Sequence, residues 1–321
     1  MSQFQRILQW GWNSYFEASW NDGARDGVVP ARVIAQQRGF WRVAGEFGEC
    51  WAEAAGRLRL TADEGADWPA VGDWVAVELR DGEKAAVILE VLPRRSRFVR
   101  KSAGKKMEEQ VIAANVDTAL LVSALDGDFN PRRVERYLAQ CWESGAKPVL
   151  VLNKADACID AAVRAAEMEC VALGAPVYLI SARTGQGFEE LEKMLTPGQT
   201  FVLLGSSGVG KSTLANRLLG ESRQEVQAVR EGDSRGRHTT TARELFVLPG
   251  GARWWIRRAC GSCSWGTRRR GWRKFLRISM RWRGCAASAT ANMKRNRDAR
   301  YARRWKRERW TKRGWRASAN F

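Results

Sequence analysis

The first third of the chain alternates apolar and polar residues in short stretches that are separated by turn residues. Alternation with a period of two residues predicts strands that bury one face, and the closely spaced turns predict antiparallel neighbours. Five strands within residues 31–92 indicate a small β-barrel of the oligonucleotide-binding (OB) type, a fold that often holds nucleic acid but does not prove that use. The predicted strands are 31–35, 41–43, 51–54, 73–79 and 85–91.

From residue 116 onward, uninterrupted apolar stretches alternate with segments of helical periodicity. Strands without polar alternation are typical of a parallel sheet that helices cover on both faces. The pattern therefore predicts a doubly wound α/β domain, whose ligands bind at the carboxyl ends of the strands. The predicted strands are 118–124, 148–153, 177–181 and 201–205, and the predicted helices are 131–144, 161–173, 188–195 and 211–219.

The formal net charge of +19 is distributed very unevenly. Residues 254–321 contain 22 Lys and Arg, two acidic residues and eight of the 16 tryptophans, for a net charge of +20. The preceding residues carry a net charge of −1. The excess of basic charge is therefore a property of the tail and not of the part of the chain before it, so the total charge does not by itself indicate a nucleic-acid-binding fold.

No stretch of 18 apolar residues is present, and residues 1–15 lack the uninterrupted apolar core of a signal peptide. The four cysteines before residue 254 are scattered, without pairing or metal-binding spacing, which favours a reducing compartment. These cysteines are Cys50, Cys141, Cys158 and Cys170. We therefore expect a cytoplasmic protein with no membrane attachment.

A phosphate loop is predicted at Gly205-Ser-Ser-Gly-Val-Gly-Lys-Ser212, between a predicted strand and a predicted helix. Glycines let successive backbone amides turn toward the phosphates, and the start of the helix adds partial positive charge. Lys211 is expected to bridge the β- and γ-phosphates, and the Ser212 hydroxyl to bind magnesium. The predicted nucleotide-binding residues here are Gly205, Ser206, Ser207, Gly208, Val209, Gly210, Lys211, Ser212 and Thr213.

Recognition of guanine is predicted at Asn153-Lys-Ala-Asp156, which follows a buried strand. A carboxylate at Asp156 can accept hydrogen bonds from two donors of guanine that adenine lacks, and a mismatch would leave polar groups unpaired. Lys154 is expected to lie over the base, Ala155 belongs to the same segment, and Asn153 is expected to tie this segment to the phosphate loop. This four-residue string is by itself also an ordinary turn.

Ser181 and Ala182, one strand further along, are expected to supply a backbone amide near guanine O6. Together with the two preceding motifs, they favour GTP over ATP. The base-reading elements precede the phosphate loop in the chain, whereas common GTPases have the opposite order. A sheet whose termini lie close together tolerates such a circular permutation.

A switch loop is predicted at Gly236-Arg-His-Thr-Thr-Thr241, before the strand 244–248. A threonine in a flexible loop can sense the γ-phosphate through magnesium, and Thr239 or Thr240 is the candidate. Ser212 and Thr239 are thus the predicted magnesium ligands. His238, the single histidine, either orients the attacking water or is a solvated loop residue. The predicted catalytic residues are Lys211, His238 and Thr239.

Residues 93–106 carry seven positive charges and no acidic residue. Such a segment can neutralise several phosphates of a nucleic acid. It can equally be a solvated linker, because Phe98 is the one aromatic residue in it that could stack on a base.

Together these residues resemble the RsgA family, the circularly permuted GTPases of small ribosomal subunit biogenesis. The resemblance runs from about residue 31 to 252 and rests on Pro69-Ala-Val-Gly-Asp-Trp74, Ala113-Ala-Asn-Val-Asp117, Asp126-Gly-Asp-Phe-Asn130, Leu152-Asn-Lys-Ala-Asp156, the phosphate loop and Gly236-Arg-His-Thr-Thr-Thr241.

The resemblance implies slow GTP hydrolysis that the small ribosomal subunit stimulates, late in the maturation of that subunit. It implies contact with ribosomal RNA through the barrel. We expect a monomer that uses GTP or GDP with Mg²⁺. The resemblance also suggests His238 as a catalytic residue and a zinc-binding Cys/His domain after the GTPase domain.

The predicted fold is therefore an OB-like β-barrel followed by a doubly wound P-loop GTPase domain in circularly permuted order. In chain order the predicted parts are an N-terminal extension (1–30), the barrel (31–92), a basic linker (93–112), the GTPase domain (113–253) and an irregular Arg/Trp-rich tail (254–321).

The tail departs from the family, because it has neither an Asp-Thr-Pro-Gly motif nor the Cys/His ligands of a zinc site. Cys260 and Cys263 are followed by Cys285 and by no histidine, so we assign no zinc ligand to this chain. Permitted codons for residues 254–265, read from the third base, give Val-Asp-Thr-Pro-Gly. We therefore hypothesise a shift of the reading frame near residues 251–253.

Two other functions remain open at this point. The barrel, the linker and the basic tail could make a non-enzymatic RNA-binding protein in which nucleotide is structural and hydrolysis is lost with the missing motif. A membrane-surface role for the tail is less favoured, because the tail has no regular apolar stripe.

Overall fold

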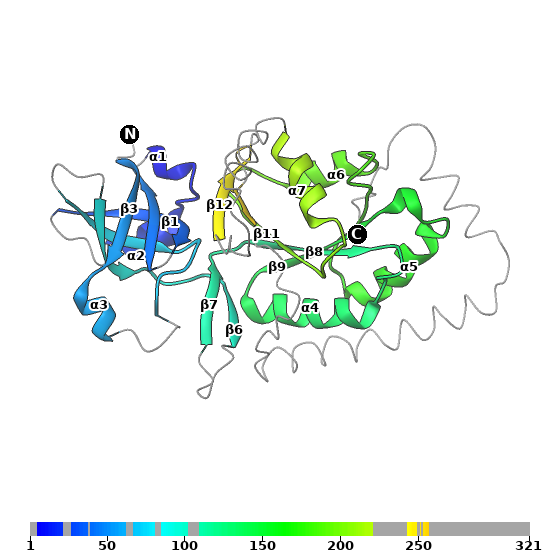
Figure 1. Ribbon diagram of the computed structural model, residues 1–321, viewed down its shortest axis with the longest axis horizontal. Helices are drawn as coiled ribbons and strands as arrows, with labels where there is room; N and C mark the ends of the chain where they lie inside the picture. The colour runs from blue at the N-terminus through cyan, green and yellow to red at the C-terminus, as the bar shows by residue number, and fades with distance from the viewer. Residues whose placement is uncertain are drawn as a thin grey trace, which may run out of the picture.

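The computed structural model describes residues 5–21, 27–37, 39–61, 67–80, 85–101, 109–220, 243–248, 251 and 253–256. Figure 1 shows two lobes, an N-terminal lobe of strands and a larger lobe in which helices flank a sheet. This division agrees with the fold that the sequence predicts.

The N-terminal lobe is a closed β-barrel. Its strands pair in the order β1–β2–β3–β5–β4, and β4 also pairs with β1. The one parallel pair is β3–β5, and the other neighbours run antiparallel. The strands are β1 (Val28–Gln37), β2 (Phe40–Gly45), β3 (Gly48–Ala54), β4 (Trp74–Leu79) and β5 (Ala85–Val91), and a short helix, α3 (Gly56–Thr61), follows β3.

Two short helices precede the barrel, α1 (Gln5–Leu8) and α2 (Ser14–Asn21). Trp12 and Phe16 pack against the buried Trp74 of β4, with ring centroids 4.7 and 5.7 Å from that ring. The N-terminal segment therefore contributes aromatic side chains to the same core as the barrel.

The C-terminal lobe is a doubly wound sheet with the strand order β10-β9-β8-β11-β13-β12. The first five strands are parallel and β12 is antiparallel to β13. They are β8 (Thr118–Ala124), β9 (Lys147–Asn153), β10 (Val177–Leu179), β11 (Thr200–Leu204), β12 (Arg243–Val247) and β13 (Arg253–Ile256).

Helices cover both faces of this sheet. Figure 1 shows α4 (Pro131–Ser144) and α5 (Ala161–Ala172) on one face, and α6 (Phe188–Met194) and α7 (Lys211–Leu219) on the other. Strand β11 occupies the middle of the sheet although three of the parallel strands precede it in the chain. The sheet is therefore circularly permuted, as the order of the motifs predicts.

The sheet extends beyond residue 253, where the sequence analysis places the start of an irregular tail. Trp254, Trp255 and Ile256 continue β13, which lies between β11 and β12. The expectation of irregular structure is wrong for these three residues. Aromatic and β-branched residues favour a strand, and a shift of the reading frame would not change that preference. Residues 257–321 lie outside the described residues.

The segment that was assigned as a basic linker contains a two-stranded antiparallel sheet, made by β6 (Arg97–Lys101) and β7 (Glu109–Ala114). Two arginines just before it pair with acidic residues. Arg94 donates two hydrogen bonds, of 2.7 and 2.8 Å, to the buried carboxylate of Asp73. Arg95 lies 3.4 Å from Asp117. The charge of Arg94 is therefore neutralised by Asp73 of the barrel, which leaves less positive charge in this segment for binding a nucleic acid.

The two lobes share one sheet. Strand β1 of the barrel pairs with β12 of the GTPase lobe, with Ala35 opposite Glu244 and Gln36 opposite Arg243. The side chain of Arg42 on β2 forms an ion pair with Glu244. These contacts join the barrel directly to the strand that follows the predicted switch loop.

Candidate nucleotide-binding site

The phosphate loop connects β11 to α7 and has left-handed or otherwise positive φ angles at three glycines, 154° at Gly205, 82° at Gly208 and 92° at Gly210. A Cβ atom at Gly205 would lie 2.3 Å from the carbonyl oxygen of Val122. A Cβ atom at Gly210 would lie 2.2 Å from Nδ2 of Asn153. Two of the glycines therefore allow the loop to pass closely over strands β8 and β9.

This loop has the donors that an anion requires. Helix α7 begins at Lys211, and no side chain caps the preceding Gly210, so its first amide groups point out of the helix end. The ammonium of Lys211 donates to the carbonyl oxygen atoms of Gly205, at 3.0 Å, and of Ser206. Burial lowers the pKa of Lys211, which an anionic ligand would counteract. The residues present thus fit the phosphates of a nucleotide.

Gly210→Ala is expected to weaken GDP binding by about tenfold or more, because the new methyl group would displace the Asn153 amide and strain the backbone. Gly174→Ala is the matched control, since Gly174 has a similar φ of 87° but open space around it. Isothermal titration calorimetry with GDP measures both variants. Equal affinities of the two variants would contradict the role of the Asn153 contact.

Asn153 joins the predicted base-reading segment to the phosphate loop. It ends β9, and its side chain is buried. Its Nδ2 donates to the carbonyl oxygen of Val209 at 2.9 Å, and its Oδ1 accepts from the amide of Ala182 at 2.9 Å. One amide side chain therefore connects three segments that lie far apart in the sequence.

Lys154 and Asp156 follow at the carboxyl end of β9. Lys154 adopts a left-handed conformation with φ of 66°, and its Nζ lies 2.6 Å from Oδ2 of Asp126. Asp156 belongs to the short 3₁₀ helix Ala155–Ala157, and Arg183 lies 2.8 Å from its carboxylate. A hydrogen bond from the Ser181 hydroxyl is the largest influence on Asp156 and lowers the pKa of its carboxyl, and the charge of Arg183 lowers it by a smaller amount. Asp156 is therefore an anion at neutral pH, as the predicted contact with guanine requires.

The structure places Asn153, Lys154, Ala155 and Asp156 beside Ser181 and Ala182, at the carboxyl ends of neighbouring parallel strands, and the phosphate loop at the end of β11. Ser212 and Thr213 lie in the first turn of α7. His238, Thr239 and Thr240, the predicted switch residues, lie outside the described residues.

Four residues at this edge were given no role by the sequence analysis. Asp126 pairs with Lys154, and Asp128 and Arg133 lie against Ser206. Nη1 of Arg217 donates to the carbonyl oxygen of Ala182 at 3.2 Å. Residues 126–130 are among the segments on which the resemblance to the RsgA family rests. The residue pattern of this segment does not by itself predict a contact with the phosphate loop.

Magnesium has one described candidate ligand, the hydroxyl of Ser212, because Thr239 is not among the described residues. Over the described ranges, no group of three or more His, Cys, Asp or Glu side chains could hold a metal ion. The protein thus offers a hydroxyl and a phosphate site, a set that suits magnesium bound together with nucleotide phosphates.

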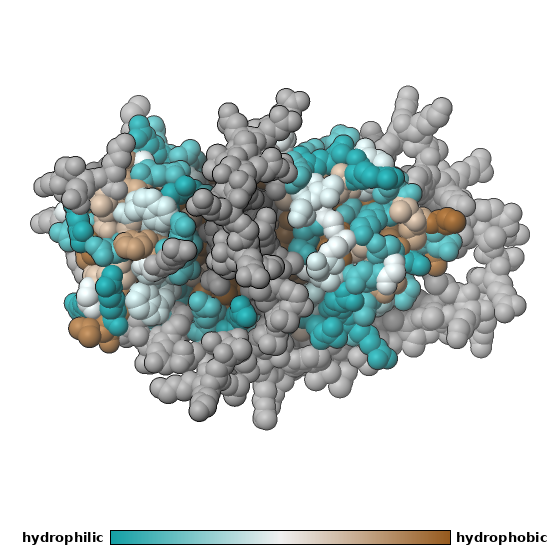
Figure 2. Space-filling view, in the orientation of Figure 1, coloured by the Kyte–Doolittle hydropathy of each residue, from teal (hydrophilic) through white to brown (hydrophobic). Residues whose placement is uncertain are grey.

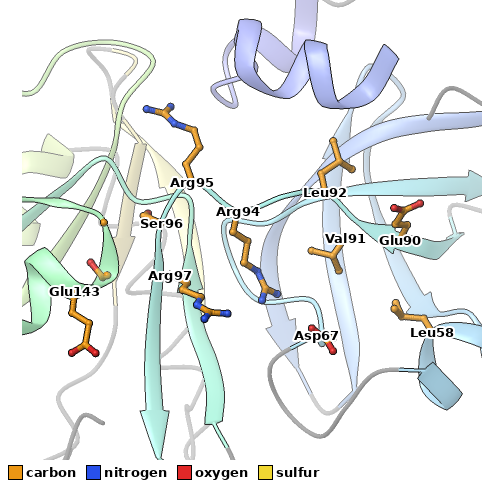
Figure 3. A pocket seen from close by; sticks show the side chains of 12 residues that line it. Leu58, Asp67, Glu90, Val91, Leu92, Arg94, Arg95, Ser96, Arg97 and Glu143 are labelled. Carbon is orange, nitrogen blue, oxygen red and sulfur yellow. The ribbon is translucent and has the colours of Figure 1, made fainter. Parts of the chain in front are cut away.

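A hollow of about 660 Å³ lies where the barrel, the β6–β7 sheet and α4 meet. Figure 3 shows Arg94 and Arg97 extending into this space and Arg95 pointing away from it. Asp67, Glu90 and Glu143 also line the hollow. None of the described residues of the nucleotide site lines this hollow, so the two are separate.

Hydrophilic residues cover most of the described surface of the GTPase lobe on the face in Figure 2. Within the described part of the chain, no helix is long and apolar enough to cross a bilayer.

A phosphate loop that follows the central strand β11, base-reading elements that follow β9 and β10 in the same sheet, and this permuted strand order define a circularly permuted P-loop GTPase. A family model described as RsgA GTPase matches residues 91–254. The chain belongs to the RsgA GTPase family.

Its relatives include proteins named small ribosomal subunit biogenesis GTPase RsgA. The protein from Syntrophotalea carbinolica is 45% identical over 253 residues, which are 77% of this chain and 69% of the relative. The protein from Opitutus terrae is 46% identical over 250 residues, 75% of this chain and 68% of the relative.

Two solved structures share the fold. YjeQ from Thermotoga maritima has a TM-score of 0.54 at 24% identity, over 71% of this chain and 73% of that chain. YloQ, described as a circularly permuted GTPase, has a TM-score of 0.52 at 20% identity, over 75% of each chain. Both agree with the barrel and the permuted sheet described above.

Proposed function

We propose that this protein is a slow, cytoplasmic, monomeric GTPase that acts late in the maturation of the small ribosomal subunit, which stimulates its hydrolysis of GTP. Binding of a guanine nucleotide is supported by one observation above all: the side chain of Asn153 forms hydrogen bonds that connect the base-reading segments to the phosphate loop. The names of the relatives support the ribosomal part.

In this proposal residues 205–213 hold the phosphates, while Asp156 reads the guanine base and Lys154 lies over it. The amide of Ala182, oriented by Asn153, faces guanine O6. Bound magnesium neutralises charge on the phosphates, with Ser212 and Thr239 as its ligands. His238 orients the attacking water.

Slow turnover is supported by the sequence. No glutamine is evident that could orient the water, and the Asp-Thr-Pro-Gly motif of the family is absent. Loss of that motif should weaken metal positioning and hydrolysis more than recognition of guanine, whose contacts come from other strands.

The barrel is proposed to contact ribosomal RNA. Its OB topology is suited to nucleic acids, although topology alone does not define a ligand. Zinc, which the family is expected to bind, has no proposed ligands in this chain.

Single-turnover hydrolysis of GTP with and without purified small ribosomal subunits tests the proposed function. We expect the subunits to raise the rate by about tenfold or more, since a partner can supply transition-state stabilisation. Large ribosomal subunits are the control and should leave the rate unchanged. An unchanged rate with small subunits would contradict the proposed function.

The basic tail favours one competing function, a non-enzymatic RNA-binding protein. That function requires RNA binding that weakens steeply with salt and disappears when the chain ends after Ile256, the last residue of β13, together with no stimulation by small subunits. Filter binding at several salt concentrations, with the full chain and the shortened chain, separates the two.

We also propose that residues 254–321 result from a shift of the reading frame near residues 251–253. Support comes from the uneven charge and from codons that permit Val-Asp-Thr-Pro-Gly in another frame. Sequencing of the DNA around codons 245–260 is the test. An intact gene with no alternative continuation would overturn this proposal.

A further inference from the structure

Arg133 lies at the phosphate loop although it belongs to a different helix. Helix α4 begins at Pro131, and Asn130 caps it by accepting a hydrogen bond from the amide of Arg133 at 3.0 Å. Nη1 of Arg133 then donates to Oδ1 of Asp128 at 2.6 Å and to Oγ of Ser206 at 2.7 Å. The capped helix start therefore aims a guanidinium at the second residue of the loop.

Asp128 completes this cluster. Oγ of Ser206 donates to Oδ2 of Asp128, so that Arg133 and Ser206 bind the two oxygen atoms of one carboxylate. Although partial burial raises its pKa, the hydrogen bonds from Arg133 and Ser206 leave the pKa of Asp128 below its ordinary value. The cluster thus contains an anion at the phosphate loop.

Arg133 and Lys211 approach the loop at the same residue. Lys211 donates to the carbonyl oxygen of Ser206, and Arg133 donates to the Ser206 hydroxyl. The negative charge of Asp128 also acts on Lys211. Because the lysine of a phosphate loop reaches the β- and γ-phosphates, Arg133 lies at the end of the loop that receives them.

This cluster is open to a ligand. The side chains of Arg133 and Asp128 are 24% and 33% exposed. An ion pair with this exposure contributes little to stability, because solvent screens it. A phosphate offers a guanidinium more charge and, like a carboxylate, two oxygen atoms that can accept its hydrogen bonds in parallel. Arg133 can therefore exchange the Asp128 carboxylate for a phosphate by a change of hydrogen-bond partner.

We propose that Arg133 binds the γ-phosphate of GTP as an arginine supplied by the chain itself, and that Asp128 occupies the guanidinium until GTP enters. The proposal deepens the proposed function, on which it rests. GDP has no γ-phosphate, so Arg133 would distinguish GTP from GDP. Such an arginine also stabilises the charge that develops during phosphoryl transfer.

Binding of GDP and of a non-hydrolysable GTP analogue, measured by calorimetry on the full chain, tests this role. Arg133→Ala is expected to weaken analogue binding by about 10- to 100-fold, the range for a charge-assisted hydrogen bond, and GDP binding by less than about threefold. Arg132→Ala is the matched control, because Arg132 is an exposed neighbour on the same helix. It should leave both affinities unchanged.

Asp128→Ala gives an independent measurement. It frees the guanidinium, so analogue binding is expected to tighten by about threefold or more, and this gain should vanish in the Asp128→Ala/Arg133→Ala double variant. If Arg133→Ala fails to fold, Arg133→Lys provides the comparison, since it keeps the charge and loses the two-pronged geometry. It should still lose more affinity for the analogue than for GDP.

Equal weakening of GDP and analogue by the Arg133 variants would mean that Arg133 only supports the loop, and unchanged affinities would mean that it is a surface ion pair. Either result overturns the proposal. Failure of the wild-type chain to bind any guanine nucleotide would instead refute the nucleotide pocket itself, so the two failures are distinguishable.

Discussion

Arg32→Met is expected to lower the free energy of unfolding by about 3–5 kcal/mol, the largest change in stability that we expect from a single substitution. The Arg32 side chain is buried, with 2% of the residue exposed. It donates to the carbonyl oxygen atoms of Trp10, Gly72 (3.2 Å) and Asn115 (3.3 Å) and to the Thr200 hydroxyl (2.9 Å). Methionine is also a long side chain but cannot donate to these acceptors, of which the carbonyl oxygen of Gly72 keeps a side-chain donor, Nδ2 of Asn115.

Urea denaturation followed by tryptophan fluorescence measures this loss. Arg59→Met is the control, because Arg59 is 53% exposed on its side chain and pairs with a partly exposed glutamate. That substitution should change the free energy of unfolding by less than about 1 kcal/mol. A loss below about 1 kcal/mol for Arg32→Met would show that its hydrogen bonds contribute little net stability.

Asp156→Asn is expected to weaken GDP binding by about 100-fold or more, because a neutral amide loses the charge and presents a donor to a donor of guanine. Xanthosine diphosphate offers an acceptor at that position of the base, so the same variant should bind it better than the wild type does. The Asp156 backbone lies in the 3₁₀ helix Ala155–Ala157, which either side chain can occupy.

Calorimetry with both diphosphates measures this exchange of preference. Asp160→Asn is the control, since Asp160 is an exposed residue before α5 whose side chain makes no capping hydrogen bond. Its affinities should equal those of the wild type. GDP binding that survives Asp156→Asn would place the base elsewhere in the protein.

The parts of the fold that the sequence predicts are those whose signals are local. The barrel strands follow from alternation, and the buried strands β8, β9 and β11 follow from short apolar stretches. The phosphate loop is recognisable because its glycines and lysine lie within eight residues. In each case the pattern needs no knowledge of distant contacts.

The parts that were missed depend on tertiary contacts. Arg133 meets Ser206 across 73 residues of chain, and Arg32 meets Thr200 across 168. The sequence predicts a linker where β6 and β7 pair, because the positive charges of the segment hide a weak alternation of apolar and polar residues. Trp254 and its neighbours were read as irregular from their composition, although the sheet accepts them as a strand.

The pairing of β1 with β12 connects the barrel mechanically to the GTPase lobe. Arg243 and Glu244 are hydrogen-bonded into the barrel edge and follow Thr240 by only a few residues. We therefore expect a displacement of the barrel to displace Arg243 and Glu244 with it. We also expect a load on the barrel to be passed to the GTPase lobe, because β12 pairs with β1 on one side and with β13 on the other.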